Sequence, residues 1–511
     1  MGYDKNVEEK TYTDDLFWEI INSRKRWSFL NLLVSLFLLL TIQLFHLDRW
    51  DWVYLVYALW QFFVYGKLLH SELKSPGLSM LSLFFMGALM TLALPSYSYA
   101  VGMIGHKQYY CLDVYEITDF LFRTSAAMNV YYSLFILLLT WFTNERMFIV
   151  DINVIAKKYN LFYLALFLYL VAIVFRVVPF LGSISSTLEQ FASSLPLLVV
   201  FLLAIYCGLS STRDKYYWLF LAVLVIEIVG AFVFGMYKGT IIINAAMYIL
   251  YYYLHTRTMG RKLINTSSIV ISLFFLIFIT YIVYPFIMIK RNESGFQLNS
   301  DDDEMKEVDN MDVFMRVLTL DYDFSEIGGG DDDNSSAFTG RMSAIYANAF
   351  FYQDAYHNGY HSDLLKMSSQ SLIPRFLYPD KLEGSEGNMT FSYMMGKEFN
   401  PLDTSSNFVG LFAGSYFWGG WLGSLLMCII NAWILSLLLK TCFSHLDNLL
   451  AWIVLTMILI PMMRCFEESS DGGVKSDVFF LIYTVLVQCF SIFLVWWRKM
   501  KQDHHEEALL S

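Results

Sequence analysis

Long apolar runs, separated by short polar stretches, dominate the chain. A run of about 18 or more apolar residues is typical of a transmembrane helix, because about 20 helical residues cross the hydrocarbon core of a bilayer. The pattern predicts an all-α polytopic membrane protein. Its twelve expected helices cover residues 27–46, 50–67, 79–98, 121–142, 161–179, 195–211, 217–236, 240–256, 268–288, 418–439, 449–465 and 477–497.

The composition agrees with this class of protein. The 511 residues are 57% hydrophobic and only 16% charged, whereas soluble domains carry about 25% charged residues. The formal net charge of −11 gives no sign of a nucleic-acid partner, because the acidic residues concentrate at the N-terminus and in one polar segment. The six cysteines show no C-x-x-C spacing, so the sequence predicts no metal site of that kind.

Basic residues near the helix ends predict the orientation in the membrane. If all twelve helices span, the basic clusters fall on one side, and the positive-inside rule makes that side cytoplasmic. Both termini are then cytoplasmic as well. The clusters are Arg24, Lys25 and Arg26; Lys67 and Lys74; Arg146, Lys157 and Lys158; Arg213 and Lys215; Arg257, Arg261 and Lys262; Lys440; and Arg498, Lys499 and Lys501.

The spans divide the chain into five parts. These are a cytoplasmic tail (1–26), helices 1–9 (27–289), a large extracytoplasmic loop (290–417), helices 10–12 (418–497) and a second cytoplasmic tail (498–511). Within the loop, residues 301–334 are acidic and glycine-rich, which is typical of a solvated segment. The run "NFVGLFAGSYFWGGWLG" predicts a short interfacial helix or re-entrant piece before the tenth span, because aromatic residues favour the headgroup region.

Positively charged residues also recur on the predicted outer face, where positive charge is normally rare. One explanation is snorkelling, in which Arg and Lys near a helix end reach water at modest cost. The size of the set instead favours a bound anion, since a guanidinium can hold two phosphate oxygens at once. The residues are Arg123, Arg176, Lys238, Arg341, Arg375, Lys381 and Arg464.

A more specific signal lies between about residues 230 and 430. The stretches there include "YKGTIIINAAMYILYYY", "GRMSAIYANAF", "IPRFLYPDK" and the glycine/aromatic run. Together they resemble the Wzy-type polymerases of O-antigen and other polysaccharide repeat units. The resemblance implies a fold like that of the GT-C membrane glycosyltransferases, related to the O-antigen ligases, with one large extracytoplasmic loop.

The resemblance also implies an activity. Such enzymes join polyprenyl-pyrophosphate-linked oligosaccharide repeat units into a surface polysaccharide on the outer face of the bacterial cytoplasmic membrane. The transfer inverts the anomeric centre and uses no metal or other cofactor. As partners we expect the lipid-linked oligosaccharide as donor and acceptor, the bilayer, and a chain-length regulator and flippase of the same pathway. We expect no nucleic acid.

On this resemblance, the outer cations have a role in the chemistry. Negative charge grows on the lipid pyrophosphate as it leaves, and fixed cations stabilise that charge more in the transition state than in the ground state. We therefore expect a pyrophosphate-binding set that draws on several distant parts of the chain. Its members are Arg176, Lys238, Arg341, Arg375, Lys381 and Arg464.

The acceptor hydroxyl needs a general base within hydrogen-bond reach. The candidates are Glu467, Glu468 and His361, with His357 and Glu227 as further choices. The adjacent glutamates could instead form a solvated turn, and Glu227, which lies within a span, is expected to have a structural partner. The two histidines are four residues apart, but the sequence supplies no third metal ligand beside them.

Several alternatives stay open. The tyrosines of the loop, which include Tyr352, Tyr356, Tyr360 and Tyr378, suit either stacking on sugars or ordinary packing at the membrane interface. An O-antigen ligase would use the same donor with another acceptor. A transporter or flippase of lipid-linked glycan predicts internal repeats, and the sequence shows none. A scaffold for an export machine would leave the outer cations unexplained.

Overall fold

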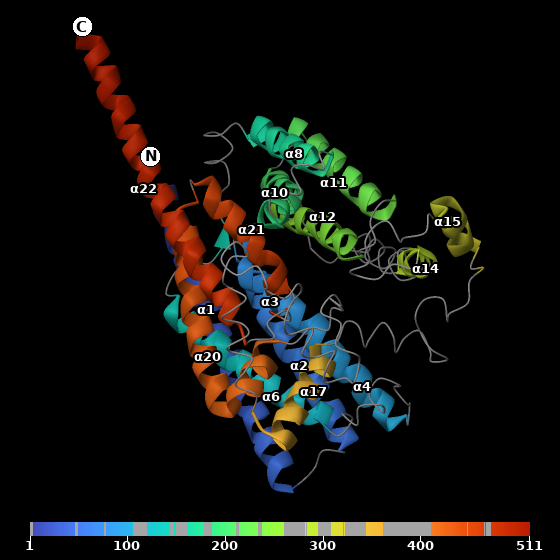
Figure 1. Ribbon diagram of the computed structural model, residues 1–511. Coiled ribbons are helices and arrows are strands. Elements are labelled where there is room, and N and C mark those ends of the chain that lie inside the picture. Colours follow the sequence, from blue (N-terminus) through green and yellow to red (C-terminus); the bar gives the residue numbers. More distant parts are fainter. Residues whose placement is uncertain are drawn as a thin grey trace. The chain divides into compact units, whose positions relative to one another are not determined.

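The structure is a computed structural model, and its described elements are almost all helical (Figure 1). It describes residues 4–45, 50–75, 78–105, 120–143, 148–149, 161–177, 186–210, 214–233, 238–259, 282, 284–294, 308–319, 321, 344–360, 410–446, 448–463, 465–466 and 472–510. The chain forms two compact units. Unit 1 comprises Met1–Ile149 and Ser335–Ser511, and unit 2 comprises Val150–Asn334.

Unit 1 contains most of the long apolar helices. Six of its helical segments are long and apolar enough to cross a membrane: Asp15–Phe45, Asp51–Glu72, Met80–Ile104, Leu121–Phe142, Leu411–Ser444 and Ser476–Trp497. The expectation of a helical membrane protein is thereby confirmed in its coarse form, while the count of twelve spans stays a prediction. The elements are α1 (Asp4–Phe45), α2 (Asp51–Glu72), α3 (Met80–Ala88), the π-helical turn η1 (Leu89–Ala93), α4 (Leu94–Ile104), α6 (Leu121–Phe142), α17 (Ala344–Asn358), α20 (Leu411–Ser444), α21 (Leu449–Met463) and α22 (Val474–Leu510).

Contacts within unit 1 fix the directions of its first helices. Along α1 the partners on α2 run in reverse order, since Ser35 bonds to Tyr57 at 2.7 Å and Arg24 bonds to Glu72 at 2.7 Å. The two helices are therefore antiparallel. The order of contacts between α2 and α6 is the same on both, which makes these helices parallel: Gln61 donates to Ser125, and Tyr65 donates to Asn129. These directions agree with a chain that crosses the bundle up and down in turn, with α1, α2, α3–α4 and α6 as consecutive segments.

A buried polar network joins α1, α2 and α6 midway along the bundle. The Asn31 amide donates to Ser133 Oγ at 2.9 Å and to Asn129 Oδ1 at 3.3 Å, and its oxygen accepts from the Trp60 indole at 3.0 Å. Buried polar groups need such partners where no water is present. Such interhelical bonds therefore fix the register of the helices.

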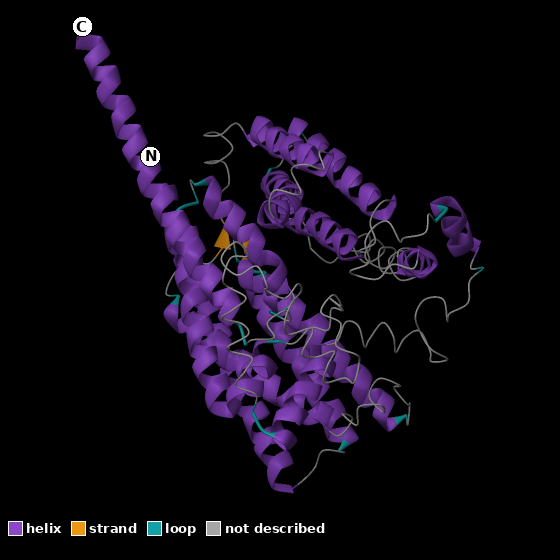
Figure 2. Ribbon diagram, in the orientation of Figure 1, coloured by secondary structure: helices purple, strands orange, loops and turns teal. Residues whose placement is uncertain are grey.

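The two ends of this bundle are chemically different. At one end Arg24, Glu72 and Ser79 lie together, close to the only strand pair among the described residues, Leu78–Ser79 with Phe148–Ile149 (Figure 2). At the other end Phe120 leads into α6 and contacts α17. The two ends are called here the Arg24 end and the Arg123 end.

Unit 2 is a second group of helices. It comprises α8 (Leu161–Val177), α10 (Ser186–Leu209), α11 (Lys215–Val233), α12 (Lys238–Thr258), α14 (Tyr284–Ser294) and α15 (Asn310–Thr319). The buried Glu227 on α11 accepts a hydrogen bond from Tyr169 on α8 at 3.1 Å, so this carboxylate has the structural partner that the sequence predicted for it. Most of the predicted ninth span, 268–288, lies outside the described residues.

Candidate functional site

Helix α17 brings part of the predicted outer loop onto the Arg123 end. Its buried residues recur at the three- and four-residue spacing of one helical face: Ile345, Asn348, Ala349, Phe351, Tyr352 and Ala355. The side chain of Asn348 then accepts a hydrogen bond from the backbone N–H of Gly410 at 3.1 Å, at the N-cap of α20. Two segments that lie 62 residues apart in sequence are joined by this bond.

Helix α20 is two helices that meet at Gly420. The backbone there has φ 58° and ψ −152°, which a glycine adopts without the strain of a side chain. The two arms form an antiparallel helical hairpin. Ser415 Oγ in the first arm donates to Ser424 Oγ in the second at 3.4 Å, and a side chain on Gly423 would meet the Ser415 carbonyl. The first arm is almost wholly buried. A short helical arm therefore precedes the longer one, and the placement of this arm at the interface or as a re-entrant piece stays a prediction.

Arg123 lies in the first turn of α6, under aromatic rings. Its side chain is only 3% exposed, and the centre of its guanidinium lies 5.1 Å from the ring centroids of both Phe120 and Tyr356. A cation over a ring face is stabilised by the electron-rich face of the ring, more strongly where water is excluded. The residue that the sequence marked as an outer cation is therefore an internal one, covered by α17.

The structure separates the loop tyrosines into two groups. Tyr352 is fully buried, with its ring centroid 4.5 Å from that of Tyr416 and 5.5 Å from that of Phe412. Tyr356 and Tyr360 are 47% and 59% exposed, and His357 between them is exposed as well. We call Tyr356, His357 and Tyr360 the ledge. Tyr378 lies outside the described residues.

Adjacent tyrosines of α6 hold the chain on both sides of the predicted catalytic segment. The hydroxyl of Tyr132 donates to the Cys465 carbonyl at 2.9 Å. The hydroxyl of Tyr131 accepts from the amide nitrogen of Asn431, which also donates to the Gly472 carbonyl at 2.9 Å. Cys465 and the next residue have φ values of 49° and 57°, in the left-handed region, and such residues persist only when their surroundings hold them.

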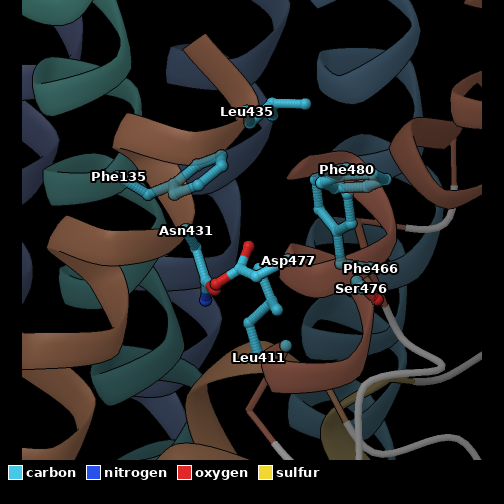
Figure 3. A pocket seen from close by; sticks show the side chains of 9 residues that line it. Phe135, Leu411, Asn431, Leu435, Phe466, Ser476, Asp477 and Phe480 are labelled. Carbon is cyan, nitrogen blue, oxygen red and sulfur yellow. The ribbon is translucent and has the colours of Figure 1, made fainter. Parts of the chain in front are cut away.

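A small cavity lies beside these contacts, between α20 and the start of α22, with room for about one water molecule. Figure 3 shows the Asp477 carboxylate and the Asn431 amide pointing toward one another in it. The Gly472 carbonyl can only accept a hydrogen bond, so the amide nitrogen of Asn431 must face it and the amide oxygen must face the cavity. Both residues are at most 5% exposed.

The side chains of the predicted pyrophosphate set lie outside the described part of the chain. Arg176 and Lys238 lie in α8 and at the start of α12, but only their backbones are described. Whether the set shares a site therefore stays a prediction. Seven further predicted residues lie wholly outside the described part of the chain: Arg341, Arg375, Lys381, Arg464, Glu467, Glu468 and His361. Of the further bases, His357 lies in unit 1 and Glu227 in unit 2.

Two features of the site were missed from the sequence. The aromatic cover of Arg123 comes from α17, more than two hundred residues away, and no local pattern reveals it. Asp477 stands at the start of an apolar span, and an ionisable residue there is itself a signal of function. Within the described ranges, no group of three His, Cys, Asp or Glu side chains could hold a metal ion.

A family comparison covers the region of these contacts. The model of the family described as Domain of unknown function (DUF8712) matches residues 81–445. The match takes in α6, α17 and both arms of the α20 hairpin, and it ends before the cavity residue Asp477. No curated protein and no solved structure matches the chain.

Proposed function

The chain belongs to the DUF8712 family, and on that premise we propose that it polymerises polyprenyl-pyrophosphate-linked oligosaccharides. The enzyme transfers the growing glycan from its lipid carrier to the next lipid-linked repeat unit, at the outer face of a bacterial cytoplasmic membrane. It acts as a metal-independent, inverting glycosyltransferase. The sequence resemblance between about 230 and 430 supports this reaction class.

The observation that carries the proposal is the construction of the Arg123 end. Residues from the predicted outer loop fold onto the start of α6 and bury a guanidinium beneath aromatic rings. Preorganised cations near a leaving pyrophosphate stabilise its developing charge, and exclusion of water strengthens the effect. Aromatic rings that flank the same place suit the apolar faces of sugars.

The proposal gives the chain's other residues defined tasks. Arg176, Lys238, Arg341, Arg375, Lys381 and Arg464 hold the donor pyrophosphate. Glu467, Glu468 or His361 accepts the proton of the acceptor hydroxyl as the new glycosidic bond forms, and the lipid pyrophosphate leaves with the electron pair of the broken bond. The bonds from α6 and α20 to Cys465 and Gly472 support this idea, because these residues flank both glutamates.

Reconstitution tests the function directly. Purified full-length protein in lipid vesicles receives lipid-linked repeat units from the producing bacterium, together with the chain-length regulator and flippase of that pathway. We expect a ladder of polymer on a gel. No polymer from any repeat unit under these conditions would contradict the proposal.

A variant series locates the site within this assay. We expect Arg375→Ala to lower the rate by about 10²–10³, the usual effect of losing one preorganised donor, while membrane insertion stays intact. Arg375→Lys keeps the charge but not the planar fork of the guanidinium, so its rate should lie between that of Arg375→Ala and that of wild type. Unchanged chain length and rate in Arg375→Ala would remove this residue from the site.

A further inference from the structure

We propose that helix α15 lies in the surface of the bilayer, with one apolar face among the acyl chains. The helix comprises Asn310–Thr319 and belongs to the acidic, glycine-rich part of the chain, whose composition predicted a solvated loop. The inference goes beyond the proposed function, because it holds whether or not the protein polymerises a glycan. All the contacts that carry it lie within unit 2.

Three large apolar side chains of α15 are exposed along one line. Met311, Met315 and Leu318 follow the four- and three-residue spacing of one helical face, and they are 67%, 51% and 49% exposed. Val313 and Val317 are fully buried on the opposite side, since residues two apart are separated by about 200° around a helix. The helix therefore packs through one apolar face and leaves a second one open.

A polar stripe runs beside the open apolar face. The residue that follows each exposed apolar side chain is polar, which gives the set Asp312, Arg316 and Thr319. None of the three is buried, and they lie about 100° further round the helix. A helix in the bilayer surface needs this pairing of faces, because its apolar face enters the acyl region while its polar face meets water.

The direction of both faces is fixed by contacts at the polar side. The Asp309 carboxylate accepts a hydrogen bond from the backbone N–H of Met311 at 2.9 Å, which caps the start of the helix. Further along, the Arg316 guanidinium forms an ion pair with Glu293 on α14. These contacts hold the polar stripe toward the end of α14, so the open apolar face cannot turn inward.

The partner of α15 places it at membrane depth. The buried valines of α15 form one cluster with residues of α14 (Figure 1), and two of these, Phe286 and Ile287, belong to the last turns of the predicted ninth span, 268–288. Ile228 on α11 packs against the same cluster. It lies well inside the predicted seventh span, 217–236. A helix that docks here lies beside the ends of two spans, where the acyl region begins.

The size and charge of the open face decide which occupant it fits. A stable protein interface buries about 800 Å² on each partner, and three side chains on a helix of ten residues offer much less. Contact with acyl chains has no such minimum, because each apolar side chain adds its own area. Asp309 and Asp312 stand against one arginine that Glu293 already pairs, so the helix does not select an anionic headgroup. We therefore assign the face to acyl chains.

Photo-crosslinking identifies what covers this face. Full-length protein that carries p-benzoylphenylalanine in place of Met315 is prepared in nanodiscs of phosphatidylethanolamine. Under ultraviolet light the benzophenone carbonyl inserts into a C–H bond that it touches: its carbon bonds to the acyl carbon, and its oxygen takes the hydrogen. We expect mass spectrometry to find the peptide of α15 heavier by one lipid.

Asp312 is the matched control, because it lies next to the apolar face on the polar stripe. The same amino acid in place of Asp312 should give at least tenfold less lipid adduct. Met311 is a second position on the apolar face and should behave like Met315. A melting temperature equal to that of wild type shows that a substituted protein is folded, and a folded protein with either methionine replaced is sufficient for the test.

Three results would overturn the inference. One is an equal yield of lipid adduct from the Met315 and Asp312 positions. Another is a cross-link from Met315 to a different segment of the chain, because protein would then cover the face. The third is a lipid adduct that forms only when phosphatidylglycerol is added, since headgroup charge would then be the cause. A failure to make polymer in the reconstitution refutes the proposed function alone, because the cross-linking is done without any glycan.

Discussion

Unit 1 buries an arginine near each end of its bundle, and the two are held in different ways. At one end Arg24 Nε lies 2.7 Å from Glu72 Oε1, and Ser79 Oγ donates to the other carboxylate oxygen at 2.5 Å. At the other end Arg123 lies beneath the rings of Phe120 and Tyr356. Both arginines are almost inaccessible to solvent, at 6% and 3% exposure.

The difference shows which end suits a ligand. Glu72 in direct contact neutralises the charge of the buried Arg24, which is the arrangement expected of a structural ion pair. The Arg123 guanidinium instead packs against the rings of Phe120 and Tyr356, which come from two distant segments of the chain. The Arg123 end also carries the exposed ledge and the glycine hinge of α20.

The largest expected effect is at the Arg24 end. Arg24→Met should lower the free energy of unfolding by about 3–5 kcal/mol, because it leaves the buried Glu72 carboxylate without its partner. Denaturation in mixed detergent and SDS micelles measures this. The double variant Arg24→Met/Glu72→Met should recover much of the loss, and a single variant as stable as wild type would show that the pair contributes little.

The second effect tests the hinge at the Arg123 end. Gly420→Ala should cost about 1–3 kcal/mol, because the backbone is in the left-handed region and the new Cβ would meet the Tyr360 phenol. The neighbouring Gly419→Ala is the control, since a Cβ there meets nothing within 4 Å. Equal unfolding free energies for the two variants would argue against the kink.

The third effect compares the arginines directly. Arg123→Met should cost about 1–2 kcal/mol, the loss of cation–π contacts in a desolvated place. This is less than the loss expected for Arg24→Met in the same unfolding assay. If both substitutions cost the same, Arg123 is held by an ion pair as strong as that of Arg24, and the contrast between the ends fails.

The smallest effect concerns the network between the two ends. Ser133→Ala removes the hydroxyl that accepts from Asn31, and should cost about 0.6 kcal/mol, the usual value for one hydrogen bond between membrane helices. Thr140→Val is a useful comparison, because Thr140 bonds only to the Ile136 carbonyl of its own helix among the contacts described. If Ser133→Ala lowers the free energy of unfolding by more than Arg123→Met does, this network contributes more to the stability of the bundle than the contacts of Arg123.

Hydropathy predicted the long helices well and their polar extensions poorly. The predicted span 121–142 coincides with α6 (Leu121–Phe142). The helix expected from residue 27 starts instead at Asp4, because polar residues can continue a helix beyond the apolar run that reveals it. The sequence predicts loop where α17 forms, because turn residues and aromatic side chains are also typical of a loop at the membrane interface. The helical period of Ile345, Ala349 and Tyr352 is the local signal of the helix.

The candidate site was predictable only in part. The glycine/aromatic run showed that something other than a simple span precedes helix ten, and Gly420 supplies the break. The sequence marked Arg123 as charged and near a helix end, but its burial depends on Tyr356, which only tertiary packing brings there. Local pattern likewise could not separate the buried Tyr352 from the exposed Tyr360.

The central claim is that the Arg123 end faces outward and handles the substrate, while the Arg24 end faces the cytoplasm. Single cysteines at Asn358 and Lys74, which lie near the two ends, test it by reaction with a membrane-impermeant maleimide in spheroplasts. Unsubstituted protein sets the background from its six cysteines. We expect Asn358→Cys to label in intact spheroplasts and Lys74→Cys only after lysis; the reverse pattern would contradict the account.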